Sequence, residues 1–205
     1  MSIKGTPCYR VSARHAQAPA PDWREQLAAR LGARPRRLGL WAELGLYGAL
    51  QCLGSNVRPT DQAALLVCSQ FGPASLLQEA LGQVHEGLPL PHTFLQIQPN
   101  QLLATLSAQL GWRGDARCVA HPQPLTVLAT ALAMAQPTNL DVLVGWVDTH
   151  PVNTSGWLHL QPVTDPTALA DTTWVRGPAH SRGSLLQSVM YVRLDAAGPA
   201  VIIEG

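Results

Sequence analysis

The stretch RCVAHPQPLTVLATALAMAQ, Arg117 to Gln136, is the part of the sequence that decides the fold. Arg117 to Ala120 has the profile of a short β-strand, and Pro124 to Ala135 is an apolar segment of helical length. Only a short turn separates the two. In many α/β enzymes such a junction carries the nucleophile, because the backbone N–H groups and the dipole of the helix stabilise negative charge. Here the turn offers His121 and Gln123, and no Ser or Cys.

The rest of the chain alternates between strand-like and helix-like patterns. We expect strands at 3–11, 63–72, 116–120 and 139–148, and helices at 19–32, 38–54, 73–87, 99–114 and 124–135. We expect 92–100 to be extended, 151–182 to be mostly irregular, and 184–205 to form a β-hairpin. This alternation predicts one α/β domain over 1–205, layered α-β-α, with a mixed, mostly parallel sheet and a closing antiparallel hairpin.

The composition excludes several classes of protein. Hydrophobic residues make up 46% of the chain and charged residues 13%, the opposite of the balance in disordered proteins, and the net charge of +1 favours neither nucleic acid nor an anionic membrane. The four cysteines form no CxxC pair, no HExxH occurs, and no apolar run is long enough for a signal peptide or a membrane span. We therefore expect a cytoplasmic protein with reduced thiols, no metal and no cofactor. The low charge content also suggests an apolar surface that a partner covers.

Four segments, in order along the chain, resemble landmarks in the N-terminal half of β-ketoacyl synthases, the condensing enzymes of fatty-acid and polyketide assembly. They are RRLGLWAELGLYGALQCLG (36–54), PNQLLATLSAQLGWRGDARCVA (99–120), QPTNLDVLVGWVD (136–148) and GPAVIIEG (198–205). The resemblance implies a thiolase-like half-fold over 1–205. It also implies that the family's C-terminal half, which supplies the histidines that activate malonyl decarboxylation, is not part of this sequence.

In this resemblance Gln123 falls on the family's nucleophilic cysteine. An amide cannot accept an acyl chain as a thiolate does. Glutamine at this position is typical of chain length factors, the non-acylating relatives that dimerise with a true ketosynthase. The resemblance therefore implies a catalytically inactive subunit that pairs with a full-length ketosynthase in fatty-acid or polyketide biosynthesis, of the aryl-polyene type, and helps shape its acyl tunnel. One departure is the bulk of Pro124, Leu125 and Thr126, where the family has small residues and glycine.

The resemblance also assigns surfaces. In the family, the region of 92–100 lies at the dimer interface and the strand of 117–120 pairs across a twofold axis. The candidate partner and acyl-tunnel residues are Phe94, Leu95, Gln96, Ile97, Asn100, Arg117, Cys118, Val119 and Ala120. The basic link with Arg34, Arg36 and Arg37 could attract an acidic acyl carrier protein, although a solvated loop is the simpler interpretation.

Two other interpretations stay open. The chain could be a stand-alone acyltransferase or thioesterase that uses Cys118 with a histidine, although a cysteine in an apolar strand, here Cys118 or Cys68, is most often a small buried hydrophobic residue. It could also be a homodimeric structural relative without chemistry. Dependence on Cys118 would favour the enzyme, and dependence on a partner would favour the inactive subunit.

Overall fold

The computed structural model describes residues 7–55, 59–88, 90–121, 123–165, 169, 174, 181–195 and 198–203. The elements, in chain order, are β1 (Cys8–His15), α1 (Trp23–Leu31), α2 (Leu40–Leu53), β2 (Ala64–Cys68), α3 (Ala74–His85), α4 (Pro91–Gln96), α5 (Asn100–Leu110), β3 (Ala116–Val119), α6 (Pro124–Ala135), β4 (Val142–Asp148), β5 (Thr154–Pro162), α7 (Arg182–Ser188), β6 (Val189–Asp195) and β7 (Gly198–Ile203). Within these residues, no helix combines the length and the apolar character needed to cross a membrane.

The strands form one seven-stranded sheet in the order β3-β2-β4-β5-β1-β6-β7. β2 pairs in parallel with β3 and with β4, and the other neighbouring strands pair antiparallel. β5 and β6 consequently run opposite to the remaining strands. The predicted α/β layers, the mixed sheet and the closing β6–β7 hairpin are confirmed, although most neighbouring pairs are antiparallel. β3 is the strand at one end of this order, and no described strand covers its outer edge.

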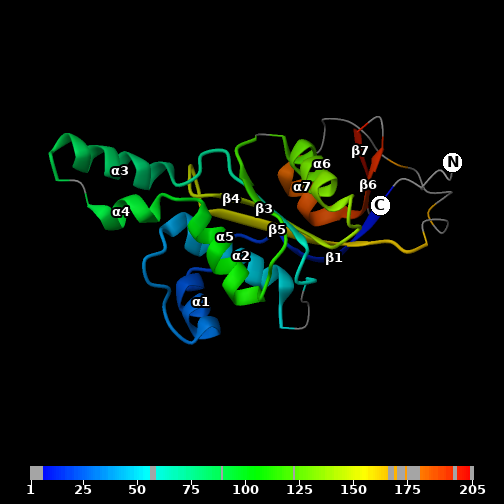
Figure 1. Cartoon of the computed structure of the whole chain (residues 1–205), viewed down its shortest axis with the longest axis horizontal. Helices are drawn as coiled ribbons and strands as arrows, with labels where there is room; N and C mark the ends of the chain where they lie inside the picture. Colours follow the sequence, from blue (N-terminus) through cyan, green and yellow to red (C-terminus); the bar gives the residue numbers. More distant parts are fainter. Residues whose placement is uncertain are drawn as a thin grey trace.

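The sheet separates two apolar cores, as Figure 1 shows: α1, α2 and α5 cover one face, and α6 and α7 cover the other. α2 packs closely because it contains two glycines. A Cβ on Gly45 would lie 2.5 Å from Leu102 Cδ2, and one on Gly48 would lie 2.1 Å from Ser155 Oγ. These glycines, which lower the intrinsic stability of a helix, are therefore the positions where α2 approaches α5 and β5.

Three expectations were wrong. Residues 92–100 are not extended, because Pro91 occupies the first turn of α4, where its fixed φ favours a helix and its missing N–H costs nothing. The region 151–182 contains the nine-residue strand β5. Its Gly- and Ser-containing sequence does not favour a strand, and hydrogen bonds to β4 and β1 stabilise it. Residues 184–188 belong to helix α7 and not to the hairpin. The first strand is also shifted to 8–15; residues 3–6 lie outside the described part of the chain.

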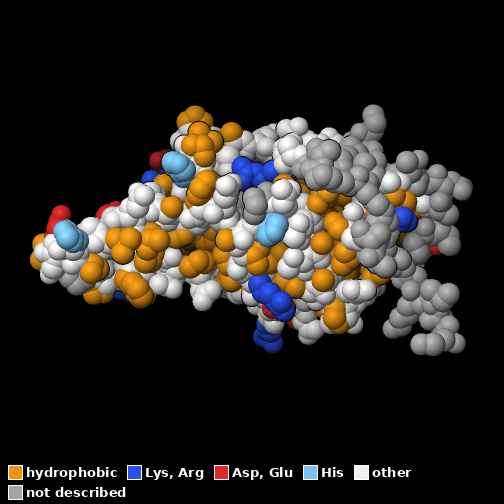
Figure 2. All heavy atoms as spheres, turned by 90° about the horizontal axis from the view of Figure 1, so that it is seen from above, with side chains coloured by type: hydrophobic (Ala, Val, Ile, Leu, Met, Phe, Trp, Pro, Cys, Tyr) orange, Lys and Arg blue, Asp and Glu red, His pale blue; other side chains and the backbone are white. Residues whose placement is uncertain are grey.

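Helices α3 and α4 project from the body of the molecule. No residue of α3 is buried, and only Thr93 of α4 is. Hydrophobic side chains gather over this narrow end, which is seen from above in Figure 2. The large exposed ones are Leu77, Leu81, Val84, Leu88, Leu90, Phe94 and Leu95. We call α3 and α4, with the loop between them, the α3–α4 arm. Such an apolar concentration on a projecting element is typical of a surface that a partner covers.

The packing predicts opposite effects for two glycine substitutions. Gly145→Ala would place a Cβ 2.4 Å from the ring of the fully buried Trp157 and should lower the free energy of unfolding by about 1–3 kcal/mol. Gly82→Ala, in α3, meets no atom within 4 Å and should not destabilise the chain, because alanine favours the helix. Urea unfolding of both variants measures the difference. Equal stability of the two variants would contradict this packing.

Candidate functional site

A cavity of about 420 Å³ lies where β2, β3 and β4 end. Its residues come from the carboxyl ends of these strands, from the start of α6 and from the start of α7. They are Cys68, Gln70, Phe71, His121, Gln123, Pro124, Trp146, Asp148, His150, Pro151, Val152, Thr154, Ser181 and Arg182. We call this the strand-end cavity. In open α/β sheets, ligands commonly bind at this end of the parallel strands.

Hydrogen bonds to the carboxylate of Asp148 connect the segments that line the strand-end cavity. Its Oδ1 accepts hydrogen bonds from Ser69 Oγ at 2.8 Å, from the N–H of Gln70 at 2.8 Å and from the N–H of Phe71 at 3.3 Å. Its Oδ2 accepts from Arg182 Nη1 at 2.9 Å, and Arg182 Nη2 donates to Thr154 Oγ1. This network joins the ends of β2 and β4 to the first turn of α7.

Sequence reasoning missed this network. A usable signal existed for part of it, because Ser69 directly follows the apolar run of β2 and Asp148 ends β4, and polar residues at neighbouring parallel strand ends meet at one edge. No such signal existed for Arg182, which lies in a segment expected to be irregular and reaches Asp148 across a separation of 34 residues.

Gln123 precedes α6 and lines the strand-end cavity, as its place in the sequence suggests. The residue is exposed, and its backbone N–H donates to Nδ1 of His121 at 3.0 Å. Because Nδ1 accepts this hydrogen bond, the proton of the neutral His121 ring is on Nε2. Pro124 is the first residue of the helix and has no N–H to offer. Pro122 of the predicted turn lies outside the described residues.

The two cysteines of this region lie in unreactive surroundings. Cys68 is buried, its Sγ donates to the carbonyl of His121 at 3.2 Å, and burial raises the pKa of its thiol. Burial, with the neighbouring Cys68, raises the pKa of the Cys118 thiol to about 11. Cys118 faces a different cavity, of about 300 Å³, whose lining includes Trp41 and Pro99 and, among the described residues, no histidine.

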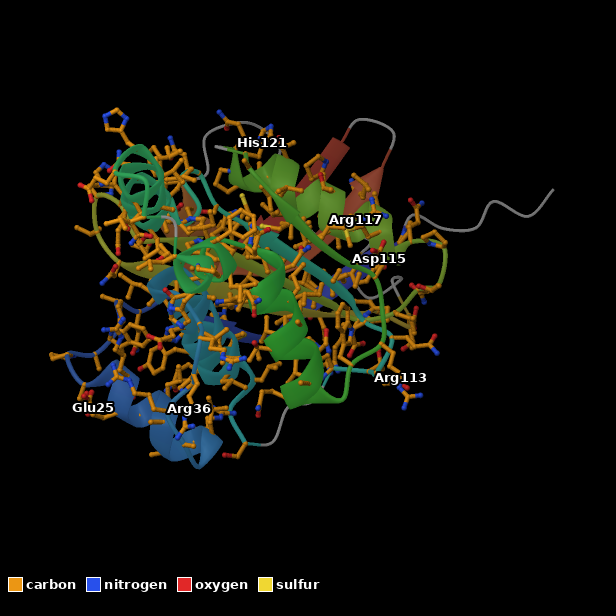
Figure 3. All side chains as sticks on the ribbon, turned by 60° about the vertical axis from the view of Figure 1, so that its left-hand side comes forward. Glu25, Arg36, Arg113, Asp115, Arg117 and His121 are labelled. Atoms are coloured by element: carbon orange, nitrogen blue, oxygen red, sulfur yellow. The ribbon has the colours of Figure 1, made fainter. Side chains whose placement is uncertain are left out.

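β3 exposes one row of backbone groups. The N–H of Leu65 donates to the carbonyl of Asp115, and the N–H of Ser69 donates to that of Val119. Since backbone groups alternate along a strand, those of Ala116, Cys118 and Ala120 point away from β2. On the surface of this strand Arg117 Nη2 donates to Asp115 Oδ2 at 2.7 Å. Figure 3 shows this pair beside the strand, with His121 beyond its far end.

The candidate tunnel residues 94–97 lie elsewhere, in the α3–α4 arm. Phe94 and Leu95 are exposed and line an apolar groove of about 460 Å³ between the two helices. Gln96 Nε2 donates to the carbonyl of Leu38 at 3.4 Å, Ile97 is half-buried after the helix, and Asn100 begins α5. None of these residues lines the strand-end cavity. The arm and the cavity are therefore separate surfaces.

The candidate carrier-protein residues, Arg34, Arg36 and Arg37, are all exposed in the link between α1 and α2. Arg36 lies on the same side as Glu25 of α1 in Figure 3. Burial raises the pKa of the Glu43 carboxyl above its ordinary value. The positive charges of Arg24 and Arg34 offset part of this rise. Across the described residues, no group of three His, Cys, Asp or Glu side chains could hold a metal ion.

Neither a protein-family profile nor the sequence of a characterised protein matches the chain. Solved structures do match. A chain of the ishigamide ketosynthase/chain length factor superposes with a TM-score of 0.58 at 15% identity, over 77% of this chain and 62% of that one. A chain of the ketosynthase ApeO in complex with its chain length factor ApeC from Xenorhabdus doucetiae superposes with a TM-score of 0.53 at 17% identity, over 77% of this chain and 79% of that one.

The chain has the ketosynthase/chain length factor fold. This confirms the thiolase-like architecture that the sequence landmarks suggested. The chain spans less than two thirds of the ishigamide protein chain that it matches, and it is similar in length to the Xenorhabdus chain, since the two covered shares are nearly equal. Within this ketosynthase-like fold, the junction of β3 and α6 carries a glutamine.

The environment of Cys118 predicts a slow reaction with alkylating reagents. With a pKa of about 11, fewer than roughly one thiol in a thousand is ionised at neutral pH. Alkylation of Cys118 by iodoacetamide, followed by mass spectrometry of its peptide, should be slow and should accelerate with pH throughout the range in which the chain stays folded. A rate that levels off between pH 8 and 9, as for a free cysteine, would contradict this environment.

Proposed function

We propose that this chain is a catalytically inactive, chain-length-factor-like subunit that pairs with a full-length ketosynthase in the cytoplasm and helps shape its acyl tunnel. The observation that carries the proposal is Gln123 at the β3–α6 junction of a ketosynthase-like fold. The products of the complex would be fatty-acid or polyketide chains of the aryl-polyene class. The partners in both solved relatives, a ketosynthase and a chain length factor, suggest the same pairing here.

The geometry of the junction supports inactivity. Condensation needs a thiolate and free N–H groups that stabilise an oxyanion. The side chain of Gln123 is an amide, and its backbone N–H is already donated to His121. The Cys68 thiol donates a hydrogen bond to the carbonyl of His121. The Cys118 thiol, on the other face of β3, stays protonated at neutral pH. These observations do not support the hypothesis of a stand-alone enzyme that uses Cys118, because its thiol has neither a neighbouring base nor a low pKa.

The edge of β3 supports pairing with an equivalent strand of the partner. The outward N–H and C=O groups of Ala116, Cys118 and Ala120 offer a regular set of donors and acceptors, and an exposed edge of this kind is a recognised site for strand addition. An antiparallel strand would join the two sheets into one. Helices α5 and α6, which flank β3, would then supply the rest of the interface.

The α3–α4 arm supports a second contact. Its exposed apolar side chains, with Phe94 60% exposed and Leu95 43%, need cover that the free chain does not provide. In the complex this arm would reach the partner and would place 94–97, with Asn100, next to the acyl chain. Arg34, Arg36 and Arg37 would offer exposed positive charge to an acidic acyl carrier protein.

Co-purification tests the proposal. The tagged chain, recovered from its native lysate, should carry a full-length ketosynthase in a complex of equal stoichiometry, identified by mass spectrometry and in-line mass determination. Cys118→Pro should abolish this co-purification, because it removes an N–H that points to the partner and leaves the ladder with β2 intact. Cys118→Ala keeps that N–H and is the matched control.

Two results would contradict the proposal. One is a chain that carries no ketosynthase and reacts covalently with an acyl thioester. The other is a Cys118→Pro variant that retains the ketosynthase at full yield, which would rule out pairing through β3. Unfolding of the free variants in urea confirms that neither substitution acts by unfolding the subunit.

The reconstituted complex allows a test of the tunnel residues. Phe94→Ala removes a large side chain from the arm and should shift the products toward longer chains, because the space at the end of the tunnel increases. Leu81→Ala, which is equally exposed on α3 but is not a candidate tunnel residue, is the control. Mass spectrometry of the products measures the distribution. An unchanged distribution in Phe94→Ala would remove this residue from the tunnel.

A further inference from the structure

The groove of the α3–α4 arm has two helical walls. α3 and α4 pack against each other and lie side by side at the narrow end of the molecule (Figure 1). Each helix contributes three residues with the spacing i, i+3, i+4, which places them on one face of that helix. They are Ala80, Gln83 and Val84 from α3 and Pro91, Phe94 and Leu95 from α4, with Leu90 just before α4.

No described segment of the chain fills this groove, and its lining is almost entirely apolar. Val84 is 61% exposed and Leu90 55%, and no charged side chain lines the groove. Gln83 is the only polar residue of the lining, and its Nε2 already donates to Glu79. An occupant must therefore bring apolar side chains and must satisfy its own polar groups.

The backbone of the two walls is already hydrogen-bonded. The carbonyls of Gln83 and Val84 accept from the N–H groups of the residues that follow α3, and the N–H of Phe94 donates to the carbonyl of Leu90. An extended segment in the groove would bury its own N–H and C=O groups without partners, which is unfavourable. A helix satisfies these groups internally. The groove therefore favours a helix over a strand or an irregular loop.

The size of the groove agrees with a helix. A helix with a diameter of about 10 Å, side chains included, and a pitch of about 5.4 Å occupies about 420 Å³ per turn. The groove measures about 460 Å³, so it can hold the inner half of a helix over two turns. Side chains at i, i+3 or i+4, and i+7 of that helix would enter the groove, as in other helix-in-groove complexes.

The charge of the arm narrows the class of helix. Residues 74–96 contain Glu79 and Glu86, both exposed, and no Lys or Arg. Figure 2 shows acidic and histidine side chains among the hydrophobic ones at this end of the molecule. An acidic carrier protein would be repelled here, and a second copy of the chain would bring the same negative charge. A helix with Lys or Arg beside its apolar face is complementary to the arm.

We propose that this groove receives one amphipathic helix of the ketosynthase partner, with apolar residues at i, i+3 or i+4, and i+7 and no acidic residue beside them. The inference rests on the proposed function, which supplies the partner. It gives the arm a defined occupant, in addition to the strand that pairs with β3. The two contacts are separable, since the groove and β3 have no residue in common.

The affinity for a purified full-length ketosynthase tests the groove. Val84→Glu places a charge in one wall and should raise the Kd of the complex roughly ten-fold or more, because the docked helix would bury that charge without a partner. Gly82→Glu is the matched control. It adds the same charge to α3 at an exposed position with no atom within 4 Å, outside the groove, and should change the Kd by less than about two-fold. Calorimetry at physiological salt measures both.

Leu90→Glu changes the other wall and should act like Val84→Glu. It also keeps the test decisive if Val84→Glu does not fold, which circular dichroism of the free chain would reveal.

Hydrogen exchange of the ketosynthase identifies the helix. At saturating concentrations, one ketosynthase segment should be protected by the unmodified chain and should lose this protection with Val84→Glu. The strand that pairs with β3 should stay protected with both. The first segment should be helical and should have the expected apolar spacing. An extended or acidic segment in its place would overturn the assignment.

The outcomes separate this inference from the proposed function. An unchanged Kd in Val84→Glu and Leu90→Glu, with a ketosynthase that still binds, would overturn the groove contact and leave the pairing through β3 in place. A ketosynthase that does not bind even the unmodified chain would overturn the proposed function, and this inference with it. Dimerisation of the free chain that Val84→Glu abolishes would assign the groove to a second copy, and would also overturn the inference.

Discussion

The carboxylate of Asp148 is the contact on which the functional end of this molecule depends. Its oxygens accept from Ser69, Gln70 and Phe71 after β2 and from Arg182 at the start of α7, while Asp148 itself ends β4. Three segments far apart in the sequence are thus tied to one buried charge. Removing the carboxylate would leave a partly buried guanidinium and two backbone N–H groups without their acceptor, which is costly in a region of low dielectric constant. The shape of the strand-end cavity follows from this network.

The same end of the sheet combines a ketosynthase-like fold with a strand–helix junction that carries no thiol. The strand–helix junction still presents its helix N-terminus to a cavity, but the residue at the junction is an amide whose backbone N–H is bonded to His121. Of the two thiols nearby, Cys68 is buried and Cys118 is half-buried, and burial raises the pKa of both. Meanwhile, the features suited to a partner lie on the outside: the free edge of β3 and the apolar α3–α4 arm. The residues of the junction and the residues of these two outer surfaces are different ones.

The successes and failures of sequence reasoning have physical causes. β2 and β4 were predictable because a continuous apolar run bounded by polar residues is typical of a strand buried on both faces. α5 and α6 were predictable from apolar residues at helical spacing. β5 was missed because Gly156 and Pro162 weaken the strand pattern, and its stability comes from pairing with β4 on one side and β1 on the other. α4 was missed because a proline can either break a helix or begin one, and the distinction depends on where the preceding residues go.

The sequence by itself determined the order of the main elements, the glutamine at the β3–α6 junction and the absence of a cysteine there, because these are local properties of neighbouring residues. Only the tertiary structure decided that α3 is left unburied, that Cys118 and Cys68 belong to different cavities, and that Trp146, His121 and Arg182 line the same cavity. The physical reason is that burial and hydrogen-bond satisfaction depend on groups brought together from distant parts of the chain. The residue pattern within a single segment does not indicate which distant groups will lie next to it.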